Sequence, residues 1–479
     1  MKKIILLTLL SCSVILTAAD QIIKNGSKPW SDRSYTISGL SENLVFKNPV
    51  PEQKCSKYNI ILPPGTRKAL IAICANDSTP GMVKKYALQP FNSTMYIGNS
   101  SNPQILKYAL FIAENPPEKI DCRPTRAGGI LLALNDDVPA LPSAAATASR
   151  ILKNVPAPEN LQGVKSFEGQ EYRFLPGKRT VEYYVRPPQV GINANTGLMI
   201  ISHNWGGTWK YTAPWCDILS DRFNLICMSV NYLQSGKYDR KKAPYEHGVL
   251  QAMDCLRALY YVQKALDDAQ IPFNRRRIYA AGASGGGNVS LMVNKLAPRT
   301  FGCIIDLCGM PGLTDDIAFG IGQLNAGYSR DPQSPHYLTP AMQEIRNPGC
   351  PAHLKLQKKW NPANQVVIVH GLDDKSCNPA DKMVIASEMV RAGFRPDTHF
   401  LTLNDVDGKI IKNTGHSIGN RPEIIAEFGG AYIAENGKFP ALLAQPSDLD
   451  TADEVTYPVT GGKYIISFKG EPTIRFEKQ

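Results

Sequence analysis

The stretch that decides the fold expected for this 479-residue chain is Ile278-Tyr-Ala-Ala-Gly-Ala-Ser-Gly-Gly-Gly-Asn288. A short apolar segment runs into Gly282-Ala283-Ser284-Gly285-Gly286, and a segment compatible with a helix follows at once. A serine hydroxyl is a weak nucleophile unless it is held on a tight turn beside a base. Strand, turn and helix in this order are the context in which G-x-S-x-G forms a nucleophile elbow. The stretch therefore predicts that Ser284 is a catalytic nucleophile.

Three consecutive glycines, residues 285–287, stand where the helix should begin. Each costs about 1 kcal/mol relative to alanine in a helix. We expect a close approach of other backbone segments to compensate for this cost.

From about residue 167, short apolar runs alternate with helical patterns. Strands are expected at 171–174, 180–185, 198–202, 225–230, 278–281, 303–307, 366–370 and 398–403, and helices near 213–222, 245–269, 380–392 and 422–435. The first two strands should form an antiparallel hairpin. The alternation that follows predicts βαβ units, and so an α/β fold with a doubly wound, mostly parallel sheet.

The chain is too long for one ordinary domain. We expect a signal peptide over residues 1–19 and a strand-rich N-terminal domain of unknown role over 20–165. The catalytic domain should span 166–440, with a cap-like insertion at 308–355. A C-terminal extension, 441–479, should add one or two strands.

The expected leader has the three parts of a secretory signal. Lys2 and Lys3 precede a short apolar core, and Thr17-Ala18-Ala19 offers small residues for cleavage. No later apolar run is long enough to span a bilayer. The sequence thus predicts an exported protein, periplasmic or secreted. An alternative is a lipoprotein lipidated at Cys12.

Ten cysteines remain after the leader, and an even number in an exported protein permits disulfides. Cys227 and Cys303 lie in apolar, strand-like runs and are expected to be buried thiols. We therefore expect some bridges and some free core cysteines.

The formal net charge is +11, but the Lys and Arg residues are scattered. An anionic substrate would suit this charge, yet scattered cations indicate no nucleic-acid partner. The seven histidines form no His-Glu-x-x-His motif, and no phosphate-binding glycine loop occurs. We expect no metal and no cofactor. The oligomeric state is left open.

A serine nucleophile requires a base and an acid that orients the base, in the order nucleophile, acid, histidine for this fold. The expected strand at 366–369 is followed by His370-Gly-Leu-Asp-Asp374. The His-Gly-x-x-Asp pattern selects Asp374 as the acid, with Asp373 in reserve. A solvated loop with two acids is the alternative.

The candidate base is His416, in the loop Asn413-Thr-Gly-His-Ser-Ile-Gly419. His399 also follows the two aspartates but lies inside an expected strand. We therefore assign His416 as the general base.

Oxyanion donors in such enzymes are backbone amides. Gly285, directly after the nucleophile, should supply one. The second should come from His203-Asn-Trp-Gly-Gly207, which resembles the His-Gly-Gly-Gly loop of lipases and esterases, although Asn204 replaces a glycine. By position the donor is Trp205, whose ring could equally be a pocket wall or an ordinary core residue.

From the elbow to His416, the chain resembles the α/β-hydrolase superfamily. Residues 245–254 (YEHGVLQAMD) and 405–416 further resemble a bacterial hydrolase family of unknown function, over roughly residues 195–425. This resemblance implies the triad Ser284, Asp374 and His416 but no substrate. A looser likeness to prolyl-oligopeptidase-type enzymes rests on the triad order and the extra N-terminal domain.

Three functions follow. The leading one is an exported serine hydrolase that cleaves a carboxylic ester through an acyl-enzyme. The second is a prolyl-oligopeptidase-like serine peptidase whose N-terminal domain restricts access. The third is a non-catalytic binding protein on a hydrolase scaffold, which would have no need to keep a strained serine turn.

Overall fold

The computed structural model describes residues 21–23, 34–38, 59–62, 64–74, 79–98, 106–122, 129–135, 138 and 154–479. It divides the chain into two compact units, Met1–Arg150 and Ile151–Gln479. The expected leader, including Cys12, lies outside the described residues.

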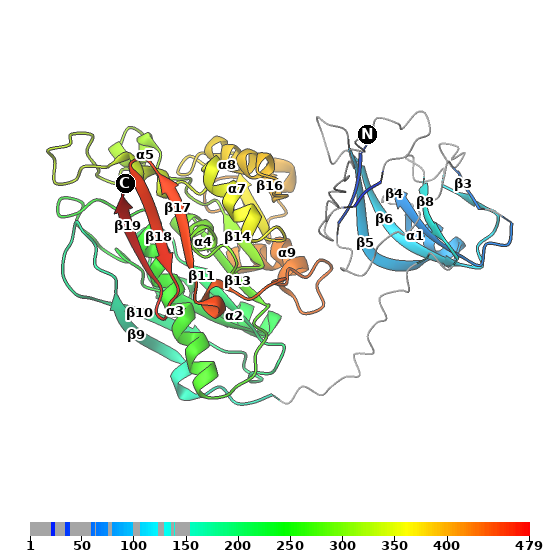
Figure 1. Cartoon of the computed structure of the whole chain (residues 1–479), viewed down its shortest axis with the longest axis horizontal. Coiled ribbons are helices and arrows are strands. Elements are labelled where there is room, and N and C mark those ends of the chain that lie inside the picture. The colour runs from blue at the N-terminus through cyan, green and yellow to red at the C-terminus, as the bar shows by residue number, and fades with distance from the viewer. Residues whose placement is uncertain are drawn as a thin grey trace, which may run out of the picture. The chain divides into compact units, whose positions relative to one another are not determined.

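The first unit is built on antiparallel strands (Figure 1). One sheet has the order β1-β2-β5-β6-β4-β8, and a separate pair joins β3 to β7. The strands are β1 (Gln21–Ile23), β2 (Ser34–Ser38), β3 (Asn59–Ile61), β4 (Lys68–Cys74), β5 (Gln89–Gly98), β6 (Leu106–Glu114), β7 (Lys119–Asp121) and β8 (Gly129–Leu134), and the helix α1 is Thr79–Lys85. Apolar residues of β4 pack on Phe111 and Met82, which gives this unit its own core.

The second unit contains an eight-stranded sheet with the order β16-β15-β14-β13-β11-β12-β10-β9. Its strands are β9 (Gly163–Gly169), β10 (Arg179–Arg186), β11 (Gly197–Ser202), β12 (Leu225–Val230), β13 (Ile278–Ala283), β14 (Cys303–Leu307), β15 (Gln365–Gly371) and β16 (Asp397–Leu401). Strand β10 runs antiparallel to both neighbours, and β11 to β16 are mutually parallel. The predicted α/β-hydrolase fold is confirmed.

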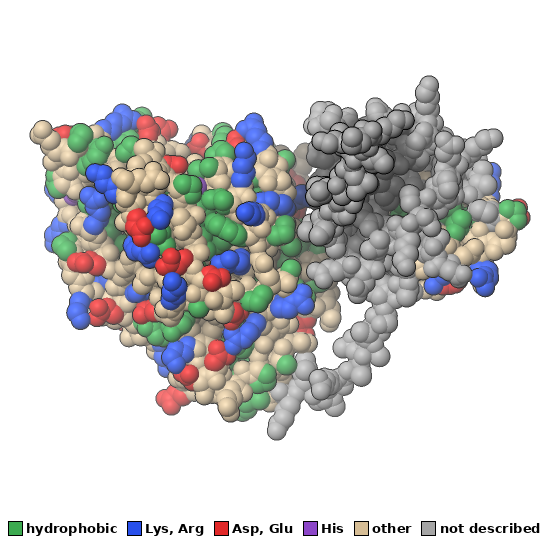
Figure 2. Space-filling model, viewed as in Figure 1, with side chains coloured by type: hydrophobic (Ala, Val, Ile, Leu, Met, Phe, Trp, Pro, Cys, Tyr) green, Lys and Arg blue, Asp and Glu red, His purple; other side chains and the backbone are tan. Residues whose placement is uncertain are grey.

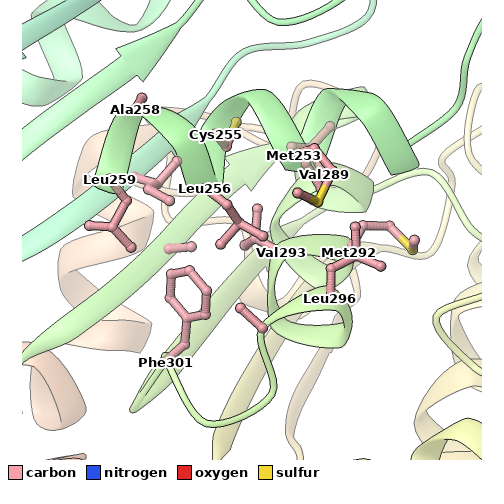
Figure 3. Close-up of a cluster of buried hydrophobic side chains, with 14 of the residues drawn as sticks. Met253, Cys255, Leu256, Ala258, Leu259, Val289, Met292, Val293, Leu296 and Phe301 are labelled. Carbon is pink, nitrogen blue, oxygen red and sulfur yellow. The ribbon is translucent and has the colours of Figure 1, made fainter. Parts of the chain in front are cut away.

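Helices cover both faces of this sheet. Successive residues of a strand point to opposite sides, so alternate side chains of one strand pack against different helices. Leu198 and Ile200 of β11 pack with α3 (Val249–Asp268) and α4 (Gly285–Leu296). Met199 and Ile201 pack on the other face with α2 (Trp209–Phe223) and α9 (Arg421–Ile433). Figure 3 shows the contact between α3 and α4, where Leu256, Val293 and Phe301 meet. Burial on both faces explains why these strands read as continuous apolar runs.

The hairpin prediction was partly wrong. Its first strand is β9, residues 163–169, whereas Tyr172 and Leu175 form only an isolated bridge in the turn that follows. Strand β9 lies at the sheet edge and its residues are mostly exposed or half-buried, so it carries little of the apolar signal that marks the central strands.

The unit boundary falls earlier than residue 165. Val155 already pairs with Ile192, and β9 belongs to the large sheet. The tail contains three strands rather than one or two: β17 (Glu454–Val459), β18 (Gly462–Ser467) and β19 (Thr473–Lys478), preceded by α10 (Asp448–Thr451). Tyr457, Ile466 and Phe468 of this tail are part of the main core, so the tail is an integral layer of the second unit.

The segment after β14 carries α5 (Asp315–Phe319), α6 (Pro340–Ile345) and α7 (Pro351–Trp360). Leu313, Ile317 and Met342 of this insertion pack with Tyr245, and Trp205 lies against the same cluster. The insertion therefore has a small apolar core shared with the loop that precedes α3.

The prediction of disulfides was wrong for the second unit. All seven cysteines within residues 154–479 are buried free thiols: Cys216, Cys227, Cys255, Cys303, Cys308, Cys350 and Cys377. Cys227 and Cys303 are core thiols, as predicted, and burial raises the pKa of both. These cysteines contribute to the packing of the core and do not crosslink it.

Charged side chains of both signs are interspersed on the visible face of residues 154–479 (Figure 2). This distribution agrees with the scattered basic residues of the sequence. Among the described residues, no helix combines the length and apolarity that crossing a membrane demands.

One buried charge makes stability depend on pH. Lys295 of α4 is fully buried and donates hydrogen bonds to the carbonyls of Ile345 and Asn347. Burial lowers the pKa of Lys295 from 10.5 to about 7. Between these values the unfolded chain binds a proton that the folded chain does not, so the stability contributed here rises with pH.

We expect Lys295→Met to change the pH dependence of unfolding. Relative to the variant, the wild type should gain stability as pH rises from about 7 to 10.5, by at most about 1.4 kcal/mol per pH unit. Urea unfolding of both proteins across this range measures the difference. Parallel pH profiles would contradict the assignment of this titration to Lys295.

Candidate active site

Ser284 stands between the end of β13 and the start of α4, with φ 57° and ψ −121°. These angles are rare for a residue with a side chain and persist only where the surroundings enforce them. The Ser284 N–H donates to the carbonyl of Leu307 (3.0 Å), and its carbonyl accepts from the Met310 amide (2.9 Å). Ser284 is 8% exposed. The turn thus presents the serine at the carboxyl edge of the parallel sheet, as an elbow requires.

The glycines of the elbow are explained by contacts that a side chain would block. A Cβ on Gly282 would lie 2.3 Å from the Gly286 carbonyl oxygen. A Cβ on Gly286 would lie 2.1 Å from the Ser202 oxygen, and one on Gly287 would lie 2.2 Å from Asp306 Oδ1. The expected close approach of backbone is therefore confirmed, and it accounts for the three glycines at the helix start.

The two predicted oxyanion donors lie side by side. The position that a Cβ would take on Gly285 is 2.8 Å from the Trp205 amide nitrogen. Within residues 154–479, neither the Trp205 amide nor the Gly285 amide donates a hydrogen bond. Two unused N–H groups beside a serine, one of them at a helix N-terminus, are suited to stabilise a negative oxygen.

The Trp205 ring is held by two tyrosines. It stacks on Tyr245 with ring centroids 3.9 Å apart, and its Nε1 donates to the Tyr238 hydroxyl (3.0 Å). Tyr245 is fully buried and anchored by a hydrogen bond from its amide to the Ala326 carbonyl. The ring thus fixes the loop that carries the Trp205 amide. These tyrosines were not predicted, because nothing in their spacing links them to Trp205.

His203, at the start of the same loop, is structural. It is buried, stacks on Tyr232, and its Nε2 lies 2.7 Å from the Ser235 hydroxyl oxygen. Burial lowers the pKa of His203 to about 4, so the ring is neutral at ordinary pH. Asn204, which replaces a glycine of the lipase loop, directs its Oδ1 over Gly207.

The structure distinguishes the two candidate acids. Asp374 is buried, and its Oδ2 lies 2.8 Å from His416 Nδ1. Its Oδ1 accepts the amides of Ser376 (2.8 Å) and Cys377 (2.9 Å). Asp373 is exposed and instead accepts a hydrogen bond from the Thr414 hydroxyl. The geometry pairs His416 with Asp374 and leaves Asp373 as a brace for the histidine loop.

His370, which precedes the acid in the His-Gly-x-x-Asp pattern, is a contact that the sequence did not identify. It is buried, and its Nε2 lies 3.3 Å from Asp374 Oδ2 and 2.9 Å from the Cys377 carbonyl. Burial alone would raise the pKa of Asp374, but hydrogen bonds from His370, His416 and the Cys377 amide hold it well below its usual range. The acid therefore stays ionised beside the imidazole.

The three predicted residues follow strand ends at one edge of the sheet. Ser284 follows β13, Asp374 follows β15 and His416 follows β16. Hydrogen bonds at the end of β14 connect the neighbouring strand ends. The Leu307 carbonyl accepts the Ser284 N–H, and the Cys308 amide donates to the Val369 carbonyl of β15 (2.8 Å). Within residues 154–479 the Ser284 hydroxyl makes no hydrogen bond. Such bonds commonly tighten only when substrate is present.

Three side-chain groups within the described residues have metal-ligand chemistry, with donor atoms inside 4.8 Å of one another. Two of them share Asp374, whose oxygens already accept hydrogen bonds from two amides and His416. The third is Glu344, Cys350 and His353, next to which lies the buried amine of Lys295.

Residues 321–473, which include Asp374 and His416 but not Ser284, match a family described as "Protein of unknown function (DUF2920)". No curated protein matches the chain.

Several solved structures are similar. An acylaminoacyl peptidase from Pyrococcus horikoshii is 14% identical, with a TM-score of 0.40, over 67% of this chain and 47% of that one. A puromycin-hydrolyzing peptidase from Mycobacterium tuberculosis is 16% identical, with a TM-score of 0.41, over 74% and 48%. A Thermogutta terrifontis esterase is 15% identical, with a TM-score of 0.38, over 58% and 98%. The chain thus spans about half the length of the two peptidases, and its fold assignment rests on its own strand order.

The contacts around the glycines predict that alanine substitutions at Gly286 and Gly430 change the stability of the protein by different amounts. Gly286→Ala should destabilise the protein by roughly 1–3 kcal/mol or more, because the new methyl group would overlap two carbonyl oxygens. Gly430→Ala in α9 is the matched control, since its nearest neighbour is Phe223 at 3.6 Å. That change should be neutral or stabilising by up to about 1 kcal/mol. Equal melting temperatures for the two variants would contradict the packing described for the elbow.

Proposed function

We propose that this protein is a serine hydrolase that cleaves a carboxylic ester through an acyl-enzyme. One observation supports this more than any other. The strained Ser284 turn has two unused amides, of Trp205 and Gly285, beside it, and the buried Asp374 is paired with the half-buried His416 after the neighbouring strand ends. Nucleophile, base, orienting acid and oxyanion donors are the parts that acyl transfer requires.

In the proposed reaction, Ser284 attacks the ester carbonyl carbon while His416 takes the hydroxyl proton. The Asp374 carboxylate accepts the Nδ1–H of His416, which leaves Nε2 as the basic atom. The developing oxyanion is held by the Trp205 and Gly285 amides at the positive end of α4. His416 then returns the proton to the leaving alcohol, and water repeats the sequence to release the acid.

A role outside the cytoplasm is part of the proposal, because residues 1–19 have the pattern of a secretory signal. The free thiols of the second unit are compatible with that location, since all seven are buried away from oxidants and partners.

Covalent labelling separates an enzyme from a binding protein. We expect the wild type to react with a fluorophosphonate probe at Ser284, and Ser284→Ala to show no labelling. Mass spectrometry of the labelled peptide locates the modified residue. Lack of any labelling, or equal labelling of the variant, would rule out Ser284 as an activated nucleophile.

Substrate class is tested with two chromogenic series. p-Nitrophenyl acyl esters should be hydrolysed with a kcat/KM well above that for aminoacyl p-nitroanilides. The reverse preference would replace the ester assignment by that of a peptidase.

The two acids provide a matched pair of variants. Asp374→Asn should lower kcat for an ester by roughly 10³–10⁴, because the amide favours the wrong imidazole tautomer. Asp373→Asn should cost less than about tenfold, since Asp373 only braces the loop through Thr414. Steady-state kinetics compares them. Similar losses in both variants would contradict the pairing of His416 with Asp374.

A further inference from the structure

A fully buried ion pair lies directly behind the serine turn. Lys382 of α8 (Pro379–Arg391) places its Nζ 2.5 Å from Asp306 Oδ2, at the end of β14, and both side chains are completely shielded from solvent. The same amine lies 3.3 Å from the Met310 carbonyl oxygen. Removing two charges from water costs several kcal/mol per ion, and an apolar pair is often as stable. The pair therefore needs an explanation other than stability.

The explanation lies in what the segment from Asp306 to Met310 holds. Leu307 accepts the Ser284 N–H, and Met310 donates to the Ser284 carbonyl. Both backbone polar groups of the strained residue are thus bound by this one short segment. Lys382 contacts the segment at its two ends, through the carboxylate of Asp306 and the carbonyl of Met310. It keeps the segment in the shape that fits Ser284.

Lys382 is also tied to the acid. The loop between Asp374 and α8 is fixed by the Ser376 and Cys377 amides, which donate to Asp374 Oδ1. The Asn378 side chain then caps α8 by accepting the Ala380 amide (3.0 Å). Lys382 follows in the first turn of the helix. A single side chain therefore connects the element that carries the acid to the segment that holds the nucleophile.

We propose that Lys382 is a positioning residue that couples the elbow of Ser284 to the Asp374 loop through Asp306 and Met310. The proposal rests on the function proposed above. It predicts that a neutral replacement of the pair preserves the fold but misplaces Ser284 relative to His416 and the oxyanion amides.

Removing Lys382 alone would have two effects that an activity measurement cannot separate. The segment from Asp306 to Met310 would lose its contact with the lysine, and the Asp306 carboxylate would lose its counter-charge. The Asp306 Oδ1 atom has no hydrogen-bond partner among the described residues and lies against the first turn of α4, 2.2 Å from the site of a Cβ on Gly287. Without the lysine, an unpaired carboxylate would remain buried beside the first turn of α4 and would destabilise the fold. The informative variant is therefore Lys382→Met combined with Asp306→Asn.

The matched control is Arg299→Met combined with Asp448→Asn. This pair also joins a buried carboxylate to a cation, at 2.7 Å, but it ties α10 to the loop after α4 and contacts none of the proposed catalytic residues. Both double variants remove one ion pair from the same unit. A purely structural role would make their effects on activity alike.

We expect the Lys382/Asp306 double variant to lose roughly 10- to 100-fold in kcat for a p-nitrophenyl ester, with KM changed by less than about threefold. The Arg299/Asp448 variant should keep the wild-type kcat, measured well below both melting temperatures. Wild-type kcat in the Lys382/Asp306 variant, or equal losses in both variants, would overturn the proposal.

Hydrogen–deuterium exchange gives a readout that does not need catalysis. Peptides covering 278–290 and 303–311 should exchange faster in the Lys382/Asp306 variant than in the wild type and in the control. Unchanged protection would overturn the proposal. If the variant exchanges faster but the wild-type protein neither labels with the fluorophosphonate nor hydrolyses esters, the coupling is upheld and only the proposed function is contradicted.

Discussion

The left-handed backbone of Ser284 is the constraint on which the rest of the second unit depends. A residue with a side chain adopts φ near +57° only when neighbouring atoms leave no alternative. Here the neighbours are the backbone of residues 202–203, which excludes a side chain at Gly286, and the segment 307–310, which binds both polar groups of Ser284. The glycines of the elbow and the segment 307–310 thus surround this one conformation and leave it little room to relax.

Much of this could be predicted from sequence because the signals are local. The elbow is a contiguous motif, and the strands around it are buried on both faces, so they appear as unbroken apolar runs such as β15. Asp374 follows such a run directly, and His416 lies in a loop after the edge strand β16; the chain order of the fold places both after Ser284. Strand β9 was missed for the opposite reason, because an edge strand with mostly exposed or half-buried residues has no apolar run to reveal it.

The contacts that support the site were not predictable, because they join residues distant in sequence. Lys382 is one of many lysines in the chain, and nothing local relates it to Asp306, 76 residues earlier. Asp306 did offer a signal, since a charged residue inside the apolar strand Cys303–Leu307 must find a partner. The absence of disulfides among the seven cysteines of residues 154–479 has a similar explanation. An even number of cysteines is a property of composition, whereas burial of each thiol depends on the packing of separate helices and strands.

Two buried aspartates, Asp306 and Asp374, lie at neighbouring strand ends on the carboxyl edge of the large sheet. They differ in the side chain that each one faces. Asp374 faces an imidazole, which can gain and lose a proton during a reaction, and its hydrogen bonds keep it ionised throughout. Asp306 faces an ammonium group that is fully enclosed, so its charge is balanced by a fixed partner. Asp374 thus faces an imidazole that is partly open to solvent, whereas Asp306 faces an amine that is enclosed together with it. Because the two acids lie at the ends of β14 and β15, the same sheet edge can fix the turn of Ser284, the proposed nucleophile, while His416, the proposed base, stays partly open to solvent.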